Sequence, residues 1–158
     1  MGVELNTIED AIRIPSWLDG ATANLVRAIV AEVASRYPDL RAALLFGSVA
    51  RHEERPLTDA EPSDVDLLLI FDLEPHLSRL PYDRRLAIYE AVGEARARYS
   101  HTPREVQVTL MVRDLVRDLV DWDPMFVSNV AHDGLLLWSR GPLPPALAAI
   151  EARETADN

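Results

Sequence analysis

The stretch "LLFGSVARHEERPLTDAEPSDVDLLLIFD", residues 44–72, decides the fold. An apolar run ends at Gly47 and Ser48, and a polar segment with two prolines follows. Asp64 and Asp66 then stand at the start of a second apolar run. Short apolar runs bounded by turn residues are typical of buried strands. The stretch therefore predicts two buried strands joined by a loop, with two carboxylates at the mouth of the second strand.

The rest of the chain alternates helical and strand patterns around this stretch. The period of the apolar residues and the capping residues predict a helix over 21–37 capped by Asp19, strands over 41–46 and 64–71, a helix from Pro81 to about Tyr99, a strand over 104–112, a helical segment over 113–120, a helix over 124–132 and a strand over 135–138. No clean period is found in residues 1–16. The fold class predicted is α/β (α+β), a small mixed sheet flanked by helices.

Several finer expectations follow from the same patterns. The strand over 104–112 alternates, so its valines and Leu110 should point one way and Glu105, Gln107, Thr109 and Met111 the other. Leu86, Tyr89 and Val92 should share one helix face, and Gly134 should end its helix in the left-handed conformation. We expect one domain over residues 1–140 and a C-terminal tail over 141–158.

Composition excludes several classes of function. The chain has 158 residues and no cysteine, so disulfides and thiolate metal sites are ruled out. A formal net charge of −10 argues against direct binding of duplex nucleic acid, which relies on basic residues. No apolar run reaches the length of about 18 residues typical of a membrane span, and no signal peptide is evident. We therefore expect a cytoplasmic protein without a membrane partner, and a nucleotide carried with a divalent metal is still allowed.

The pair Asp64 and Asp66 suggests a metal site. Side chains two residues apart in a strand share a face, so both carboxylates should project together. Like charges at this range resist burial unless a cation lies between them. Mg²⁺ takes carboxylate oxygens together with substrate phosphates, which is the chemistry of phosphoryl or nucleotidyl transfer. The alternative is that Asp64 caps a turn and Asp66 faces solvent.

Gly47 and Ser48 add a second half to the pattern. A glycine lets the backbone approach a ligand closely, and a serine at the start of the next helix supplies a hydroxyl that suits phosphate. The alternative is a strand-to-helix turn that merely needs a small residue. Glycine and serine after one strand, followed by Ser-Asp-Val-Asp before the next, form a more specific pattern than either pair alone.

The segments "LLFGSVAR" and "SDVDLLLIF" resemble the minimal nucleotidyltransferases of the DNA polymerase β-like superfamily. "DPMFVSNVAHDGLLLW" is similar to the C-terminal helix, glycine and short strand of the same family. The resemblance implies the polymerase β-like nucleotidyltransferase fold and Mg²⁺-dependent transfer of a nucleoside monophosphate, typically AMP from ATP, to an acceptor. It also implies that the metals are held by Asp64 and Asp66, and the triphosphate by Gly47 and Ser48.

Two more residues are candidates for nucleotide binding. Arg51 could meet a phosphate or be solvated at a helix end, and Ser63 opens the Ser-Asp-Val-Asp segment. Many small domains of this family are encoded beside a HEPN-domain partner as a toxin–antitoxin pair, and some modify that partner. The resemblance thus implies a HEPN-type partner and an antitoxin role, and a homo-oligomer stays possible. An antibiotic adenylyltransferase fits less well, because those enzymes are usually longer and carry an additional helical domain.

The sequence departs from the family pattern in three places. The spacer between Ser48 and Asp64 is longer than usual, and His52 stands where glycine is common, so it could contact phosphate or be merely exposed. The third catalytic acid is expected in a neighbouring strand, where this chain has Gln107. Glu105, on the same face, could replace that acid. Whether the chain is an enzyme or a catalytically degenerate antitoxin that acts by binding alone is therefore left open.

Overall fold

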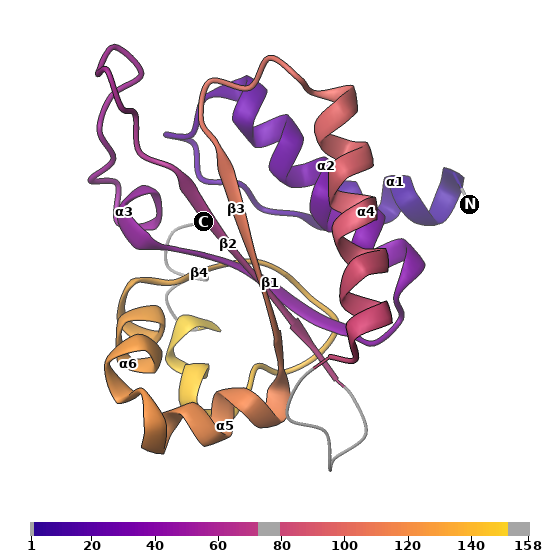
Figure 1. Cartoon of the computed structure of the whole chain (residues 1–158), viewed down its shortest axis with the longest axis vertical. Helices are drawn as coiled ribbons and strands as arrows, with labels where there is room; N and C mark the ends of the chain where they lie inside the picture. Colours follow the sequence, from indigo (N-terminus) through magenta and orange to yellow (C-terminus); the bar gives the residue numbers. More distant parts are fainter. Residues whose placement is uncertain (1, 73–79, 152–158) are drawn as a thin grey trace.

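A four-stranded mixed sheet forms the centre of the protein (Figure 1). In the computed structural model, which describes residues 2–72 and 80–151, the strand order is β3-β2-β1-β4. The strands are β1 (Leu40–Phe46), β2 (Val65–Phe71), β3 (Val106–Val112) and β4 (Leu135–Ser139). β1 pairs antiparallel with β2 and β4, and β2 pairs parallel with β3. The predicted small mixed sheet is confirmed, with β2 in its interior.

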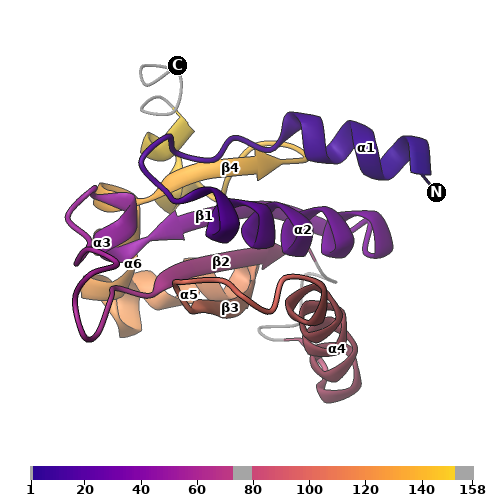
Figure 2. The same cartoon turned by 90° about the horizontal axis from the view of Figure 1, so that it is seen from above.

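Helices cover both faces of this sheet (Figures 1 and 2). They are α1 (Gly2–Ala11), α2 (Gly20–Arg36), α3 (Gly47–Ala50), α4 (Tyr82–Arg98), α5 (Arg113–Trp122), α6 (Pro124–Asp133) and the 3₁₀ helix η1 (Pro145–Leu147). α1, α2 and α4 share one hydrophobic core with the sheet. α5, α6 and η1 share the core on the opposite face. Within the described part of the chain, no helix is long and apolar enough to cross a membrane.

The alternation of side chains along β2 builds both cores. Leu67 and Leu69 face the core of α2 and α4, whereas Leu68 and Ile70 face the core of α5 and α6. Since side chains alternate with a period of two, Asp66 lies on the same face as Leu68. The same period puts Gln107 of β3 on the face where Met111 packs. Strand β2 therefore directs the side chain of Asp66 toward the side of the sheet that α6 covers.

Two helix starts follow their sequence signals. Asp19 accepts a hydrogen bond from the backbone N–H of Thr22 at 2.9 Å, which caps α2 as predicted. Asp123 accepts from the N–H of Phe126 at 3.2 Å, with Pro124 as the first residue of α6. These caps fix where α2 and α6 begin and therefore how each helix meets the sheet.

Two expectations about helices were wrong. Leu86 and Tyr89 do not join Val92 in the core, because their exposed fractions are 45% and 46%. The buried face of α4 consists of Ile88, Ala91, Val92 and Ala95. Helix α1 was not predicted at all, although Ile8 at its centre is buried against the core of α2.

Gly134 ends α6 for a different reason from the one expected. Its φ of −63° and ψ of 145° are those of extended backbone, not of the left-handed region. A Cβ at this position would lie 2.5 Å from the carbonyl oxygen of Val130 and 2.9 Å from Cδ1 of Ile150. Glycine is therefore required by close packing.

Ile150, Leu147 and Leu143 come from the predicted tail, and all three are buried in the core of α5 and α6.

Candidate functional site

The predicted carboxylates meet the glycine–serine turn at one end of the sheet. Phe46, the last residue of β1, pairs with Asp66 of β2, and Asp66 pairs on its other side with Gln107 of β3. Directly after Phe46 the chain turns into α3 at Gly47. The sheet register thus brings the end of β1 beside the starts of β2 and β3, which lie some twenty and sixty residues later in the sequence.

Gly47 and Asp66 are in direct contact. Gly47 has a φ of +80°, which side-chain-bearing residues rarely adopt. A Cβ added to Gly47 would overlap the carboxylate oxygen Oδ2 of Asp66. The glycine is therefore needed twice, once for its backbone conformation and once for the space that the carboxylate occupies. This contact links the two halves of the motif that were predicted to work together.

Asp66 carries its charge at an energetic cost. Burial is the main cause that raises the pKa of its carboxyl, and the charge of Asp64 raises that pKa further. Asp66 is half-buried and Asp64 is exposed. Among the described residues neither carboxylate has a hydrogen-bond or ion-pair partner. Two neighbouring carboxylates without a protein counter-charge are a donor set that suits a hard divalent cation such as Mg²⁺.

The third acid of such a site is not supplied by β3. Gln107 lies beside Asp66 in the parallel register, so an amide occupies the position where an acid was expected. Glu105 directly precedes β3, and its side chain is exposed. Its backbone carbonyl accepts a hydrogen bond from the N–H of Val65 at 2.8 Å. In residues 2–72 and 80–151, no group of three or more His, Cys, Asp or Glu side chains is placed to hold a metal. The replacement of the missing acid by Glu105 stays a prediction.

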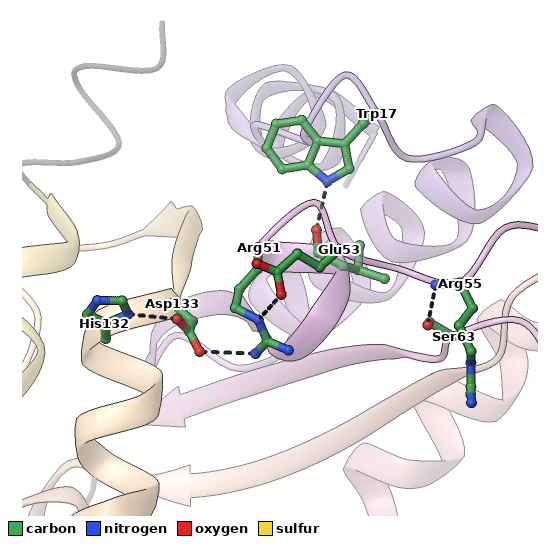
Figure 3. Close-up of polar contacts among 8 residues, drawn as sticks. Trp17, Arg51, Glu53, Arg55, Ser63, His132 and Asp133 are labelled. Atoms are coloured by element: carbon green, nitrogen blue, oxygen red, sulfur yellow. Dashed lines mark hydrogen bonds and ion pairs between the residues drawn. The ribbon is translucent and has the colours of Figure 1, made fainter.

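Arg51 lies at the end of α3 and is held by two carboxylates (Figure 3). Its Nε is 3.1 Å from Glu53, and its Nη1 is 3.1 Å from Asp133 of α6. The hydrogen bonds to Glu53 and Asp133 raise the pKa of Arg51. Asp133 also contacts Nδ1 of His132 at 2.8 Å, and this hydrogen bond is the main cause that lowers the pKa of Asp133. Arg51 thus connects α3 to α6 beside the candidate site.

The two predicted serines have different surroundings. Ser48 is half-buried, and its hydroxyl has no hydrogen-bond partner in the described part of the chain. Ser63 is buried, and its hydroxyl accepts from the N–H of Arg55 at 2.7 Å (Figure 3). Its carbonyl accepts from Arg104 at 2.9 Å. Ser63 therefore closes the base of the long loop that precedes Asp64. The hydroxyl of Ser48 is the one available to a ligand, and nucleotide binding by either serine stays a prediction.

His52 adopts a backbone conformation that glycine adopts more readily than other residues. Its φ is +58°, in the left-handed region, and its side chain is exposed. The imidazole stacks on the ring of Trp17, with centroids 4.6 Å apart and planes inclined by 14°. Trp17 in turn donates from Nε1 to the carbonyl of Val49 in α3, at 2.7 Å (Figure 3). The stack fastens the segment before α2 to the short helix that carries Gly47 and Ser48.

A pocket of about 250 Å³ opens between α3 and α6. It is lined by Phe46, Gly47 and Arg51 on one side, and by Phe126, Asn129, Val130 and Asp133 of α6 on the other. None of the α6 residues was predicted as part of the site. Their spacing of three and four residues places them on one helix face, which is the signal that could have found them.

Comparisons with known proteins find distant likenesses. Neither a protein-family model nor a curated protein sequence matches the chain. The structure is similar to a proposed nucleotidyltransferase from Sulfolobus solfataricus, with 23% identity and a TM-score of 0.43 over 77% of this chain and 89% of that one. It is also similar to a toxin–antitoxin structure with AMP-PNP, with 15% identity and a TM-score of 0.45 over 82% of this chain and 87% of that one.

At such low identity a likeness concerns the arrangement of strands and helices. The function is therefore argued from the residues of the site.

Proposed function

We propose that the protein is a nucleotidyltransferase that binds ATP with Mg²⁺ at Asp64 and Asp66 and transfers AMP to an acceptor. The observation that carries the proposal is the contact between Asp66 and Gly47. A carboxylate whose pKa is raised by burial lies against a backbone conformation that side-chain-bearing residues rarely adopt, and no described residue offers it a counter-charge. Such an arrangement costs stability and is expected where a cation and phosphates complete the site.

Each residue then has a defined task. Asp64 and Asp66 hold Mg²⁺, which when bound neutralises the charge of the phosphates. Gly47 lets the backbone approach the triphosphate, and the free hydroxyl of Ser48 donates to it. In the reaction, a hydroxyl oxygen of the acceptor bonds to the α-phosphorus of ATP, and the bond from that phosphorus to the pyrophosphate breaks. Glu105 is the proposed group that takes the proton of the acceptor hydroxyl.

The acceptor that we propose is a HEPN-type toxin, with the present chain as its antitoxin. The sequence resemblance supports this choice of partner. The net charge of −10 supports a protein acceptor over a nucleic acid. The antitoxin effect would then follow from covalent modification of the partner.

A second candidate is an antitoxin that acts by binding alone. The placement of Gln107 beside Asp66 favours it, since a neutral amide neither binds metal as an anion nor accepts a proton. Positioning and electrostatics do most of the work in phosphoryl transfer, so loss of one acid weakens turnover more than it weakens nucleotide binding.

One experiment separates the two candidates. The protein is incubated with Mg²⁺, ATP and the product of the adjacent gene, and the intact mass of both proteins is measured. An AMP-sized mass on the partner that is lost in the double variant Asp64→Asn/Asp66→Asn supports the enzyme. A tight complex without added mass, unchanged by the same substitutions, would overturn transfer and support binding alone.

A further inference from the structure

The pocket between α3 and α6 lies next to Asp66, to which two of its lining residues are connected. Phe46 lines it and is the cross-strand neighbour of Asp66, and Gly47 lines it and touches the Asp66 carboxylate. A ligand with phosphates at Asp64 and Asp66 can therefore extend into the pocket. The volume of about 250 Å³ is below the roughly 300–1,000 Å³ of pockets that enclose drug-sized ligands. It suits one ring system and not a whole nucleotide.

Aromatic side chains form one wall of the pocket. Phe46 and Phe126 pack edge to face, with centroids 5.8 Å apart and planes inclined by 79°. Both are half-buried, so part of each ring is open to a ligand. Val130 behind them is buried. Such a wall favours a flat, unsaturated ring, because aromatic faces and edges interact well with other rings.

The charges of the pocket argue against phosphate as its occupant. Among the residues that the structure describes, Arg51 is the only basic one lining the pocket, and it already contacts both Glu53 and Asp133. The positive charge is thus matched within the protein, and no excess remains for an anion. A neutral ring avoids this conflict and leaves the ion pair in place.

Asn129 supplies the polar recognition. It is exposed on α6, lines the pocket, and its amide has no hydrogen-bond partner among the residues that the structure describes. An amide offers an acceptor and two donors side by side. The same group reads adenine through the paired acceptor N7 and donor N6 in nucleic-acid recognition. An aliphatic group satisfies neither half of the amide.

We infer that this pocket receives the nucleobase of the nucleotide, with adenine as the base that Asn129 fits. The inference rests on the proposed function for its phosphate end, and it assigns Phe126 and Asn129 as the residues that select the base. The competing occupant is an aromatic side chain of the acceptor protein.

The test separates the ring from the phosphates. Binding of ATP with Mg²⁺, of tripolyphosphate with Mg²⁺, and of adenosine without metal is measured by calorimetry and by ¹H–¹⁵N NMR, which observes the side-chain amide of Asn129. We expect adenosine to shift the signals of Asn129 and Phe126. Asn129→Ala should weaken ATP and adenosine roughly tenfold or more and leave tripolyphosphate unchanged. Ser128→Ala, the exposed neighbour outside the pocket, is the matched control and should change none of the three.

The outcomes distinguish failure of the pocket from failure of the proposed function. Suppose that Mg²⁺-tripolyphosphate binds and that neither Asn129→Ala nor Phe126→Leu changes the affinity for ATP. This result would overturn the pocket assignment and leave the proposed function standing. Shifts of Asn129 caused by tyrosinamide and not by adenosine would overturn it in favour of the acceptor. Absence of binding by ATP, adenosine and tripolyphosphate to the unsubstituted protein would overturn both.

Discussion

Strand β2 has an aspartate near each of its ends, and the two have opposite surroundings. Asp72, directly after the strand, accepts from Nε of Arg41 at 2.5 Å, and Nε of Arg113 lies 3.4 Å from its other oxygen. Asp66, at the beginning of the strand, has no hydrogen-bond or ion-pair partner among the described residues, and the like charge of Asp64 raises its pKa. One strand thus carries a neutralised carboxylate at one end and an uncompensated carboxylate at the other.

The difference shows which carboxylate serves the fold. Asp39, beside Asp72, is also paired, with Arg84 of α4, so the acids at that end fasten loops and helices to the sheet. The acids at the start of β2 fasten nothing within the described chain. Groups that cost stability and pair with no part of the protein are expected at sites that bind something else.

Exchanging each carboxylate for an amide should give the largest contrast. Asp66→Asn should weaken binding of ATP with Mg²⁺ by roughly 100-fold, since even partners outside the ligand shell are worth 10–100-fold in metal affinity. Asp72→Asn should leave that affinity unchanged and lower the free energy of unfolding by about 1–2 kcal/mol, because it weakens charged hydrogen bonds. Calorimetric titration and urea denaturation measure the two effects. Equal losses of nucleotide affinity in both variants would contradict a functional role confined to Asp66.

Glycine substitutions extend the comparison to the backbone. Gly47→Ala should lower the free energy of unfolding by about 1–3 kcal/mol, owing to its φ of +80°, and should also displace the Asp66 carboxylate. Gly93→Ala is the matched control, since a Cβ there meets nothing within 4 Å in the exposed middle of α4. It should raise the free energy of unfolding by about 0.5–1 kcal/mol. Similar losses in both variants would show that Gly47 has no special role.

The pH dependence of stability should reveal the uncompensated acid. The folded-state pKa of Asp66 is raised above its unfolded value, so its contribution is favourable below the unfolded pKa and is lost as pH rises through the folded pKa. Asp66→Asn removes this contribution. The free energy of unfolding of the unsubstituted protein, relative to Asp66→Asn, should therefore fall as pH rises across that window. Denaturation curves over acidic to neutral pH test this, and a difference that rises with pH would contradict the raised pKa.

The smallest effects are expected at His52. His52→Ala removes the stack on Trp17, while a residue with a Cβ still occupies the left-handed conformation. The free energy of unfolding should therefore fall by about 0.5–1.5 kcal/mol. His52→Gly loses the same stack and relieves the backbone, so its change should be smaller than that of His52→Ala. Thermal unfolding of the two variants compares them. A glycine variant less stable than the alanine variant would show that the left-handed backbone at His52 is not strained by a Cβ.

The sequence predicted the strands, the mixed sheet and the pair of caps because these depend on local period and local hydrogen bonds. Asp19 and Asp123 signal their helices within three residues. The buried face of α4 was mistaken because Tyr89 and Leu86 are apolar yet point away from the sheet, and only tertiary packing decides which face of a helix is covered. Helix α1 was missed since its burial comes from contact with α2 and not from a clear apolar stripe.

The site was predictable in part for the same reason. Gly47, Ser48, Asp64 and Asp66 lie in one short stretch, so their local pattern and the family resemblance predicted them together. Asn129 and Asp133 reach the site through the packing of α6 beside α3, a contact some eighty residues away in sequence. The salt bridge from Arg51 to Asp133 depends on that packing and could not be read from the motif.

We expect the start of β2 to bind a metal–nucleotide and its end not to bind one. Mn²⁺ prefers the same oxygen ligands as Mg²⁺ and broadens the NMR signals of nearby nuclei. In a titration with Mn²⁺ and ATP, the backbone signals of Gly47, Asp64 and Asp66 should broaden at concentrations that leave Asp72 sharp. Equal broadening at both ends of β2, or none at Asp66, would contradict it.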